Sequence, residues 1–211
     1  MSFDLIAPHY CWMEPLLAGQ KLQHARTAHL RHLSDVHSVL ILGEGPGKFL
    51  AAFRQQFPAA QITCVDSSKR MLALAQNRVR SLNHSSANIT FIHADALEFS
   101  LPSAAFDLVV THFFLDCFRP DQLQQLIRKI ARAAMPHASW LLSDFTIPRN
   151  GFPRLRARGI HRLMYTFFRA ATKLPARALT PPDPMLRGEG FTLHRRFTTN
   201  LGLIHSDLWC R

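Results

Sequence analysis

The sequence has few cysteines, and none of them stand close together. Cys11, Cys64, Cys117 and Cys210 are scattered along 211 residues and form no CxxC pair. Disulfide frameworks and cysteine-rich zinc sites need regularly spaced cysteines, so we exclude both and expect no metal. Cys64 and Cys117 stand among apolar residues, which predicts buried free thiols. This cysteine usage favours a reducing, cytoplasmic location.

The sequence also lacks long hydrophobic runs, repeats and low-complexity segments. No apolar run approaches the length that spans a membrane. The first 17 residues include Asp4 and Glu14 and have no basic leading region, so we expect no signal peptide. Hydrophobic residues make up 47% of the chain, which suits one domain with a full core.

Acidic residues are scarce, above all toward the carboxyl end. The chain has 25 Lys and Arg against 14 Asp and Glu, a formal net charge of +11. Residues 149–211 hold 12 basic and 3 acidic side chains, so most of the excess lies there. Such a segment could contact nucleic acid, an anionic membrane surface or an acidic substrate, or be no more than a soluble surface.

Short β-like runs alternate with helical ones, which is typical of an α/β sheet. Strands are expected at 36–42, 61–65, 88–94, 106–113 and 138–145, and helices at 48–57, 69–82 and 120–136. Most of these strands are nearly unbroken apolar runs, which favours a parallel sheet covered on both faces. Two antiparallel strands at 191–199 and 203–209 are expected to complete a seven-stranded, doubly wound, mostly parallel sheet.

We expect a single domain, 1–211, in four parts. These are an N-terminal cap helix within 1–33, a core at 34–148, a basic helical insertion or lid at 149–180, and terminal strands at 181–211. Within the insertion a helix is predicted over 159–172. Its apolar residues recur at helical spacing and are expected to face the sheet, although such a stripe is also typical of plain core: Ile160, Leu163, Met164, Phe167, Phe168 and Ala171.

Three glycines alternate at the end of the first strand, in VLILGEGPGKFL from Val39 to Leu50. Glycines at such a turn let a ligand approach the backbone at the start of a helix. A P-loop would need glycine at Leu42 and Ser or Thr at Phe49, so that motif fails. The dinucleotide fingerprint GxGxxG needs a small residue at Lys48, which disfavours a nicotinamide enzyme. A tight turn without a ligand remains the plain alternative, at a high cost in chain entropy.

An apolar strand followed by Gly43, Gly45 and Gly47 resembles the class I S-adenosylmethionine-dependent methyltransferases of the small-molecule branch. The resemblance covers about residues 36–145 and the last two strands, and it implies a Rossmann-like fold. It also implies S-adenosyl-L-methionine as cofactor, with its methionine part cradled by the glycine loop, including Glu44. Backbone N–H groups at the helix start can meet the cofactor carboxylate.

Further residues match this family in chain order. Asp66, at the end of the second strand, would accept hydrogen bonds from both ribose hydroxyls. Ser67 and Met71 would pack the adenine. Asp95 would lie near the adenine amino group, with Ala96 donating its backbone N–H. Each acid taken alone could instead be a helix cap.

One position departs from the family. The acid that usually holds the cofactor amine, two residues before the first glycine, is replaced by Ile41. Glu44 could take over this contact or could face solvent. By resemblance, Tyr10 would stack near the sulfonium or its carboxylate. Three further side chains could reach the carboxylate or lie on the surface: Gln20, Lys21 and Arg26.

The methyl acceptor is expected above the strand ends, at Thr111–Phe118. Nucleic-acid amine methyltransferases often carry Asn or Asp-Pro-Pro-aromatic there, and this chain does not. His112 could be a general base oriented by Asp116, or it could only line the pocket. Asp144, at the end of the fifth strand, is a further pocket residue or a cap.

We therefore predict methyl transfer to a small, partly apolar molecule by in-line displacement. The alternatives are an RNA methyltransferase, or a cofactor-binding partner protein without catalysis. Arg158, Arg162 and Arg169 form the basic side of the insertion helix. They could attract an anionic ligand or rest weakly against a membrane surface.

Overall fold

The computed structural model describes residues 20–82, 88–172, 176 and 178–211. The strands are β1 (Ser38–Leu42), β2 (Gln61–Asp66), β3 (Ile89–His93), β4 (Phe106–His112), β5 (Ala134–Phe145), β6 (Thr192–Thr199) and β7 (Ile204–Cys210). The helices are α2 (Lys21–Thr27), α3 (Lys48–Gln56), α4 (Lys69–Ser81), α5 (Pro120–Ala133), α6 (Gly151–Thr172) and α7 (Asp183–Gly188). Short 3-10 turns lie at η1 (Leu30–His32) and η2 (Leu115–Cys117).

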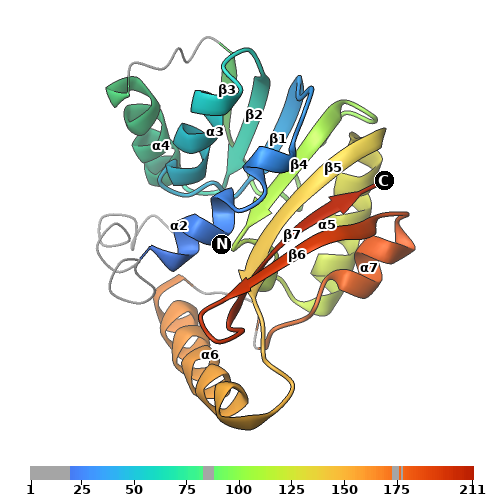
Figure 1. Ribbon diagram of the computed structural model, residues 1–211. Coiled ribbons are helices and arrows are strands. Elements are labelled where there is room, and N and C mark those ends of the chain that lie inside the picture. The colour runs from blue at the N-terminus through green and yellow to red at the C-terminus, as the bar shows by residue number, and fades with distance from the viewer. Residues whose placement is uncertain (1–19, 83–87, 173–175, 177) are drawn as a thin grey trace.

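The seven strands form one sheet in the order β3-β2-β1-β4-β5-β7-β6 (Figure 1). Strands β3, β2, β1, β4 and β5 pair in parallel, whereas β7 is antiparallel to both of its neighbours. This arrangement confirms the predicted mostly parallel, seven-stranded sheet with a C-terminal antiparallel hairpin. The strand order reverses between β1 and β4, and ligand sites in such sheets form beyond the carboxyl ends of the strands at this point.

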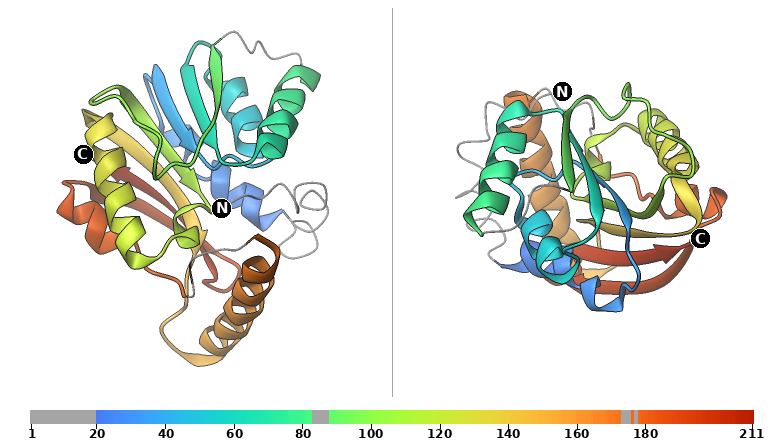
Figure 2. Two further views of the ribbon diagram at one scale, coloured as in Figure 1. Left: turned by 180° about the vertical axis from the view of Figure 1, so that it is seen from behind. Right: turned by 90° about the horizontal axis from the view of Figure 1, so that it is seen from above.

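Helices cover both faces of the sheet (Figure 2). On one face, Phe49 and Phe53 of α3 are buried against strand residues such as Leu108. On the other, the α5 residues at helical spacing pack with the buried indole rings of Trp140 and Trp209. The apolar runs of the central strands are explained by this double coverage, because side chains on both faces of β1 and β4 are buried.

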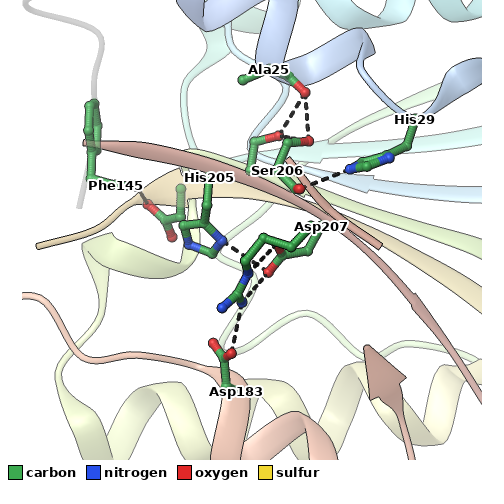
Figure 3. A network of polar contacts seen from close by, with 10 residues as sticks. Ala25, His29, Phe145, Asp183, His205, Ser206 and Asp207 are labelled. Carbon is green, nitrogen blue, oxygen red and sulfur yellow. Dashed lines mark hydrogen bonds and ion pairs between the residues drawn. The ribbon is translucent and has the colours of Figure 1, made fainter. Parts of the chain in front are cut away.

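A buried polar network fixes α2 on the sheet (Figure 3). The hydroxyls of Ser143 and Ser206 both donate to the carbonyl of Ala25, at 3.2 and 2.7 Å. The ring Nε2 of His29 lies 2.8 Å from the carbonyl oxygen of Ser206. Helix α2 is thereby held beside the carboxyl ends of β4 and β5.

The network continues along β7 at Asp207, which is fully buried. Arg196 donates to both carboxylate oxygens of Asp207, at 2.8 and 2.6 Å, and to Asp183 at 2.7 Å. Burial alone would raise the pKa of Asp207, but the bonds from Arg196 and His205 outweigh it, so the pKa is lowered. This ionised carboxylate ties β6 and the start of α7 to the sheet.

The insertion helix begins earlier than the predicted residue 159. Helix α6 starts at Gly151, whose φ is +72°. Pro153 lies in the first turn, where its missing N–H is not needed by the helix. Gly151 and Pro153, which the sequence presents as breaks, are therefore compatible with a helix start.

The predicted inner face of this helix is wrong at two positions, whereas Ile160 packs against the fold as predicted. Leu163 and Phe167 are 70% and 42% exposed. Among the side chains of α6 that the structure describes, the buried ones are Ala157, His161 and Tyr165, spaced four residues apart. The side chains of Phe168 and Ala171 lie outside the described part of the chain. Helix α6 thus meets the rest of the fold through a face of small, polar and aromatic side chains.

Helix α6 lies beyond the carboxyl ends of the strands, at one end of the molecule (Figures 1 and 2). Ala157 belongs to a small apolar cluster with Leu22 of α2 and Ile204 of β7. Among the helices that the structure describes, none is both long and apolar enough to cross a bilayer.

Candidate cofactor and acceptor site

The glycine loop joins β1 to α3 at the carboxyl edge of the sheet. Gly43, Gly45 and Gly47 have φ of +68°, +66° and +81°, a left-handed region that L side chains rarely adopt. The Gly43 N–H donates to the carbonyl of Val65, at 2.9 Å, and so holds the loop to the end of β2. A Cβ on Gly43 would collide with the ring of Phe114.

Gly45 and Gly47 differ in their surroundings. A Cβ on Gly47 would lie 2.6 Å from the Cα of Ala75 in α4, so the loop packs on that helix only with glycine there. At Gly45 no described atom lies within 4 Å of the corresponding position. The backbone at Gly45 is therefore open to a ligand just before α3, where amides and the helix dipole favour a carboxylate.

Asp66 ends β2 directly beside this loop. Its Oδ2 accepts from the Gly45 N–H at 3.3 Å, and its Oδ1 accepts from the Ser68 N–H at 2.9 Å. The cap of α4 is Ser68, whose hydroxyl accepts from the Met71 N–H at 3.1 Å. The helix-cap alternative for Asp66 is therefore excluded. Ser67, which follows Asp66 directly, is half-buried, and Met71 in the first turn of α4 is buried.

The loop after β3 lies on the same edge of the sheet. Oδ1 of Asp95 accepts from the Leu97 N–H at 2.9 Å, which shapes a local turn. Lys129 of α5 donates to the carbonyl of Ala96 at 3.0 Å and thereby anchors this turn. Asp95 and Ala96 thus follow the strand next to Asp66, as an adenosine site requires, and their contact with adenine remains a prediction.

Ile41, which replaces the acid usual in the resembled family, is a core residue. Ile41 is 1% exposed and belongs to the core beneath α3. Glu44 is half-buried, and its Oε1 accepts from the Leu50 N–H at 2.9 Å, in the first turn of α3. The alternative that Glu44 faces open solvent is therefore wrong. Burial raises the pKa of Glu44 to about 7.

Arg26 of α2 is a further charged residue near the loop. It is buried rather than on the surface, and its guanidinium carbon lies 5.1 Å from the ring centroid of Phe113. The positive charge of Arg26 opposes part of the rise that burial causes in the pKa of Glu44. Gln20 and Lys21 are exposed, in line with the surface alternative. Tyr10 lies outside the described residues.

His112, at the end of β4, is buried against α3. Its ring meets that of Phe49 edge-on, with 4.7 Å between centroids. Burial, and then the charges of Arg26 and His29, lower the pKa of His112 well below its usual value, so the ring is neutral. Within the described part of the chain, neither ring nitrogen has a hydrogen-bond partner.

The predicted pairing of His112 with Asp116 is absent. The Asp116 N–H donates to Oδ2 of Asp144 at 3.1 Å, and the Phe145 N–H donates to Oδ1 at 2.8 Å. Burial raises the pKa of Asp116 to about 6, while burial and the neighbouring charge raise that of Asp144 well above its usual range. On β5, His112 pairs with Ser143, whose hydroxyl donates to α2. Because side chains alternate along a strand, the next residue, Asp144, points to the opposite face of the sheet from Ser143.

Helix α6 adds two side chains that the sequence does not single out. The hydroxyl of Tyr165 donates to the backbone carbonyl of Asp116 at 3.2 Å. His161 is buried beside Tyr165 and Phe145, and burial lowers its pKa. The only signal for Tyr165 is rarity, because the chain has two tyrosines. With Asp116 and Asp144, they make a polar cluster at the acceptor end.

The described residues include no group of three His, Cys, Asp or Glu side chains placed to hold a metal ion. An open groove between α2 and β6 shares no lining residue with the glycine loop or the carboxylates. Its polar lining includes His24, Arg31, His32 and Arg195.

Comparison with known proteins shows what this part of the chain is similar to. Residues 39–137 match the family model described as a methyltransferase domain. A similar curated protein is the ubiquinone/menaquinone biosynthesis C-methyltransferase UbiE of Pseudomonas putida. It is 27% identical over 175 residues, covering 82% of this chain and 66% of that protein. The chain spans between 48% and 66% of the length of the first curated relatives that it matches.

Solved structures share the fold. The mitomycin 7-O-methyltransferase structure has a TM-score of 0.70 at 17% identity, covering 100% of this chain and 61% of that one. The Burkholderia thailandensis 1,6-didemethyltoxoflavin-N1-methyltransferase has a TM-score of 0.67 at 19% identity, covering 99% of this chain and 83% of that one. That structure holds 1,6-didemethyltoxoflavin and S-adenosylhomocysteine.

The matched segment contains the glycine loop, Asp66, Asp95 and the end of β4. It supplies the central strands of the sheet. The residues at the site fit the family's cofactor, since glycine geometry opens the backbone at Gly45 and a carboxylate stands beside it. Residues 39–137 thus match a methyltransferase domain, and the fold around them is shared with solved methyltransferase structures.

Proposed function

We propose that this chain transfers a methyl group from S-adenosylmethionine to a small, partly apolar molecule by in-line displacement. The observation that carries the proposal is the hydrogen bond from the Gly45 N–H to the Asp66 carboxylate, at 3.3 Å. It joins the loop expected to hold the methionine part to the acid expected to hold the ribose. Both lie at the carboxyl edge of the sheet, next to the loop after β4.

Different residues of the chain would bind different parts of S-adenosylmethionine. S-adenosylmethionine supplies a methyl group on a positively charged sulfur, which leaves as a neutral thioether. Asp66 would accept from the ribose hydroxyls, and the open backbone at Gly45 would meet the carboxylate. Glu44 is the acid nearest to the family's amine contact, because Ile41 is buried in the core.

The acceptor would lie between the loop after β4 and the inner face of α6. Half-buried Asp116 and buried Asp144 present two carboxyls there, and Tyr165 holds the loop in place. A carboxyl with a pKa of about 6 can take a proton from an acceptor near neutral pH. We therefore favour Asp116 over His112 as the base, since His112 packs against α3 on the other face. An acceptor without an acidic proton would need no base.

The small-molecule class is supported by the named relatives. Their printed names refer to quinone biosynthesis, mitomycin and a toxoflavin precursor. The aromatic surroundings of the acceptor end suit an acceptor of this kind, because the half-buried rings of Phe113 and Phe145 meet there and Phe114 lies against Gly43. A dry, aligned site is what methyl transfer mainly requires.

The test is methyl transfer from isotope-labelled S-adenosylmethionine. The protein is incubated with a panel of quinols, hydroxyarenes and nitrogen heterocycles, and separately with total RNA. We expect label in small molecules with the wild type and the exposed-site control Asp121→Ala, and none with Asp66→Asn. Label confined to RNA would favour the nucleic-acid alternative. Cofactor binding without transfer to any acceptor would favour a non-catalytic binding protein.

A further inference from the structure

The outer face of α6 carries an exposed apolar stripe. Phe152, Leu155 and Leu163 are 71%, 69% and 70% exposed. With Gly159 between them, they follow one another at intervals of three or four residues, so they share one side of the helix. Phe167 extends the same side by a further turn and is partly exposed. Large apolar side chains exposed to this degree on one helix face indicate a contact surface.

A row of arginines runs alongside this stripe. Arg158, Arg162 and Arg169 are all exposed, and their spacing of four and seven residues places them on one flank. Helix α6 contains five arginines and no Asp or Glu. In the described part of the chain, these three arginines make no ion pair. The outer face therefore combines apolar side chains with uncompensated positive charge.

The exposed apolar residues are concentrated at this end of the molecule. Of the seven large apolar side chains that are exposed in the described residues, only Leu82 lies elsewhere. Ile147 lies in the loop before α6, and Leu201 lies in the turn between β6 and β7. Arg156 of α6 joins these parts by donating to the carbonyl of Asn200 at 3.3 Å. Figure 1 shows α6 as the end of the molecule beyond the strand termini.

We propose that the outer face of α6 docks on the surface of an anionic lipid bilayer. An amphipathic helix with arginines beside bulky apolar residues lies in the membrane interface, with the apolar side in the acyl boundary and the cations at the headgroups. A second copy of the chain is a poor occupant, because an antiparallel two-fold contact would bring one arginine row against another and a parallel one would leave both rows unneutralised. Nucleic acid would pair with the arginines and leave the apolar stripe in water.

Docking would place lipid next to the acceptor end of the site. The inner face of the same helix holds Tyr165, which donates to the Asp116 carbonyl at 3.2 Å. A lipophilic molecule in the contacted leaflet would then lie across α6 from the polar cluster. The docking proposal does not depend on the chemistry at that cluster, since it rests on the outer face alone.

The test is co-sedimentation of the purified chain with vesicles. Two compositions are compared, phosphatidylcholine alone and phosphatidylcholine with phosphatidylglycerol in roughly a seven-to-three ratio. We expect binding to the anionic vesicles that weakens with salt. The triple change Arg158→Gln/Arg162→Gln/Arg169→Gln should lower the partition coefficient by roughly 100-fold. The double change Leu155→Ser/Leu163→Ser should lower it by about tenfold or more.

A matched control removes the same charge elsewhere. Lys69, Arg80 and Arg132 are exposed on α4 and α5, away from α6. Their triple change to Gln should leave vesicle binding within about twofold of the wild type if the surface of α6 is responsible. Equal losses in both triple variants, or no binding to anionic vesicles, would overturn the proposal. So would a dimer, seen by sedimentation velocity, that Leu155→Ser/Leu163→Ser dissociates. Thermal melting without vesicles verifies that each variant is folded.

Discussion

The hydroxyl of Tyr165 donates a hydrogen bond to the backbone carbonyl of Asp116, with 3.2 Å between the two oxygens. This bond joins the inner face of α6 to the loop after β4 and closes the acceptor end of the site. Tyr165 is 9% exposed, so the carbonyl would lose a buried partner if the hydroxyl were removed. Burial, followed by the charges of Asp116 and Asp144, raises the pKa of Tyr165, which keeps it a neutral donor.

We expect Tyr165→Phe to lower the free energy of unfolding by about 1 kcal/mol, a loss of roughly 2–4 °C in Tm. Cofactor affinity should be unchanged, because the bond lies outside the glycine loop, while methyl transfer should fall. Thr166→Val, which removes an exposed hydroxyl from the same helix, is the control. Equal stability of Tyr165→Phe and the wild type in thermal denaturation would show that this bond does not hold α6 in place.

Substitution by alanine should affect stability differently at Gly45 and at Gly47. Gly47→Ala meets both an unfavourable φ and the backbone of Ala75, so we expect a loss of about 3 kcal/mol or more. Gly45→Ala meets only the unfavourable φ, and a loss of about 1 kcal/mol is expected.

Chemical denaturation measures both stability losses, and titration calorimetry measures the binding of S-adenosylhomocysteine. Gly45→Ala should remain folded and bind the ligand much more weakly, since the new methyl group occupies the side from which the backbone is open. If Gly45→Ala binds as tightly as the wild type, this face of the loop is not the ligand face.

Glu44 should make stability depend on pH in a defined direction. Its folded pKa of about 7 lies above the ordinary 4.5, so folding favours the protonated form. The contribution is present in full below pH about 4.5 and is lost as pH rises through about 7. Glu44→Gln lacks this loss, so the variant should equal the wild type near pH 5. At pH 8 it should exceed it by on the order of 3 kcal/mol.

Denaturation at a series of pH values measures the difference between Glu44→Gln and the wild type, which cancels the opposite effect of the buried histidines. Glu98→Gln, at an exposed position in the loop after β3, controls for the removal of one negative charge. A difference that does not grow between pH 5 and 8 would contradict the burial of the Glu44 carboxyl. A bound cationic amine would favour the ionised form, so cofactor affinity should rise over the same range.

Much of the fold could be predicted because its signals are local. The strand runs are apolar on both faces, and each was placed within a few residues except the start of β5. The glycine loop was found because positive φ at three alternating positions has almost no other solution in sequence. Asp66 followed from its place at the end of the next strand, where chain order alone brings it to the same edge.

The rest depends on which side chains meet in three dimensions. His112 and Asp116 are four residues apart, as in one helical turn, but η2 begins only at Leu115, so that spacing does not apply. In α6, Leu163 and Phe167 of the predicted stripe face outward. The face that packs on the fold is centred on Ala157, His161 and Tyr165. Arg26 appears as a surface residue in sequence, and only its packing on Phe113 shows that it is buried.

The most direct test of the account is isothermal titration of the chain with S-adenosylhomocysteine, for the wild type, Asp66→Asn and Asp121→Ala. We predict binding to the wild type and to Asp121→Ala, and a loss of roughly 100-fold or more for Asp66→Asn, since two charge-assisted hydrogen bonds to ribose are weakened. Thermal melting of the unliganded variants verifies that the fold is intact. Equal affinity of Asp66→Asn and the wild type, or no heat of binding to the wild type, would contradict the assignment of this edge as the cofactor site.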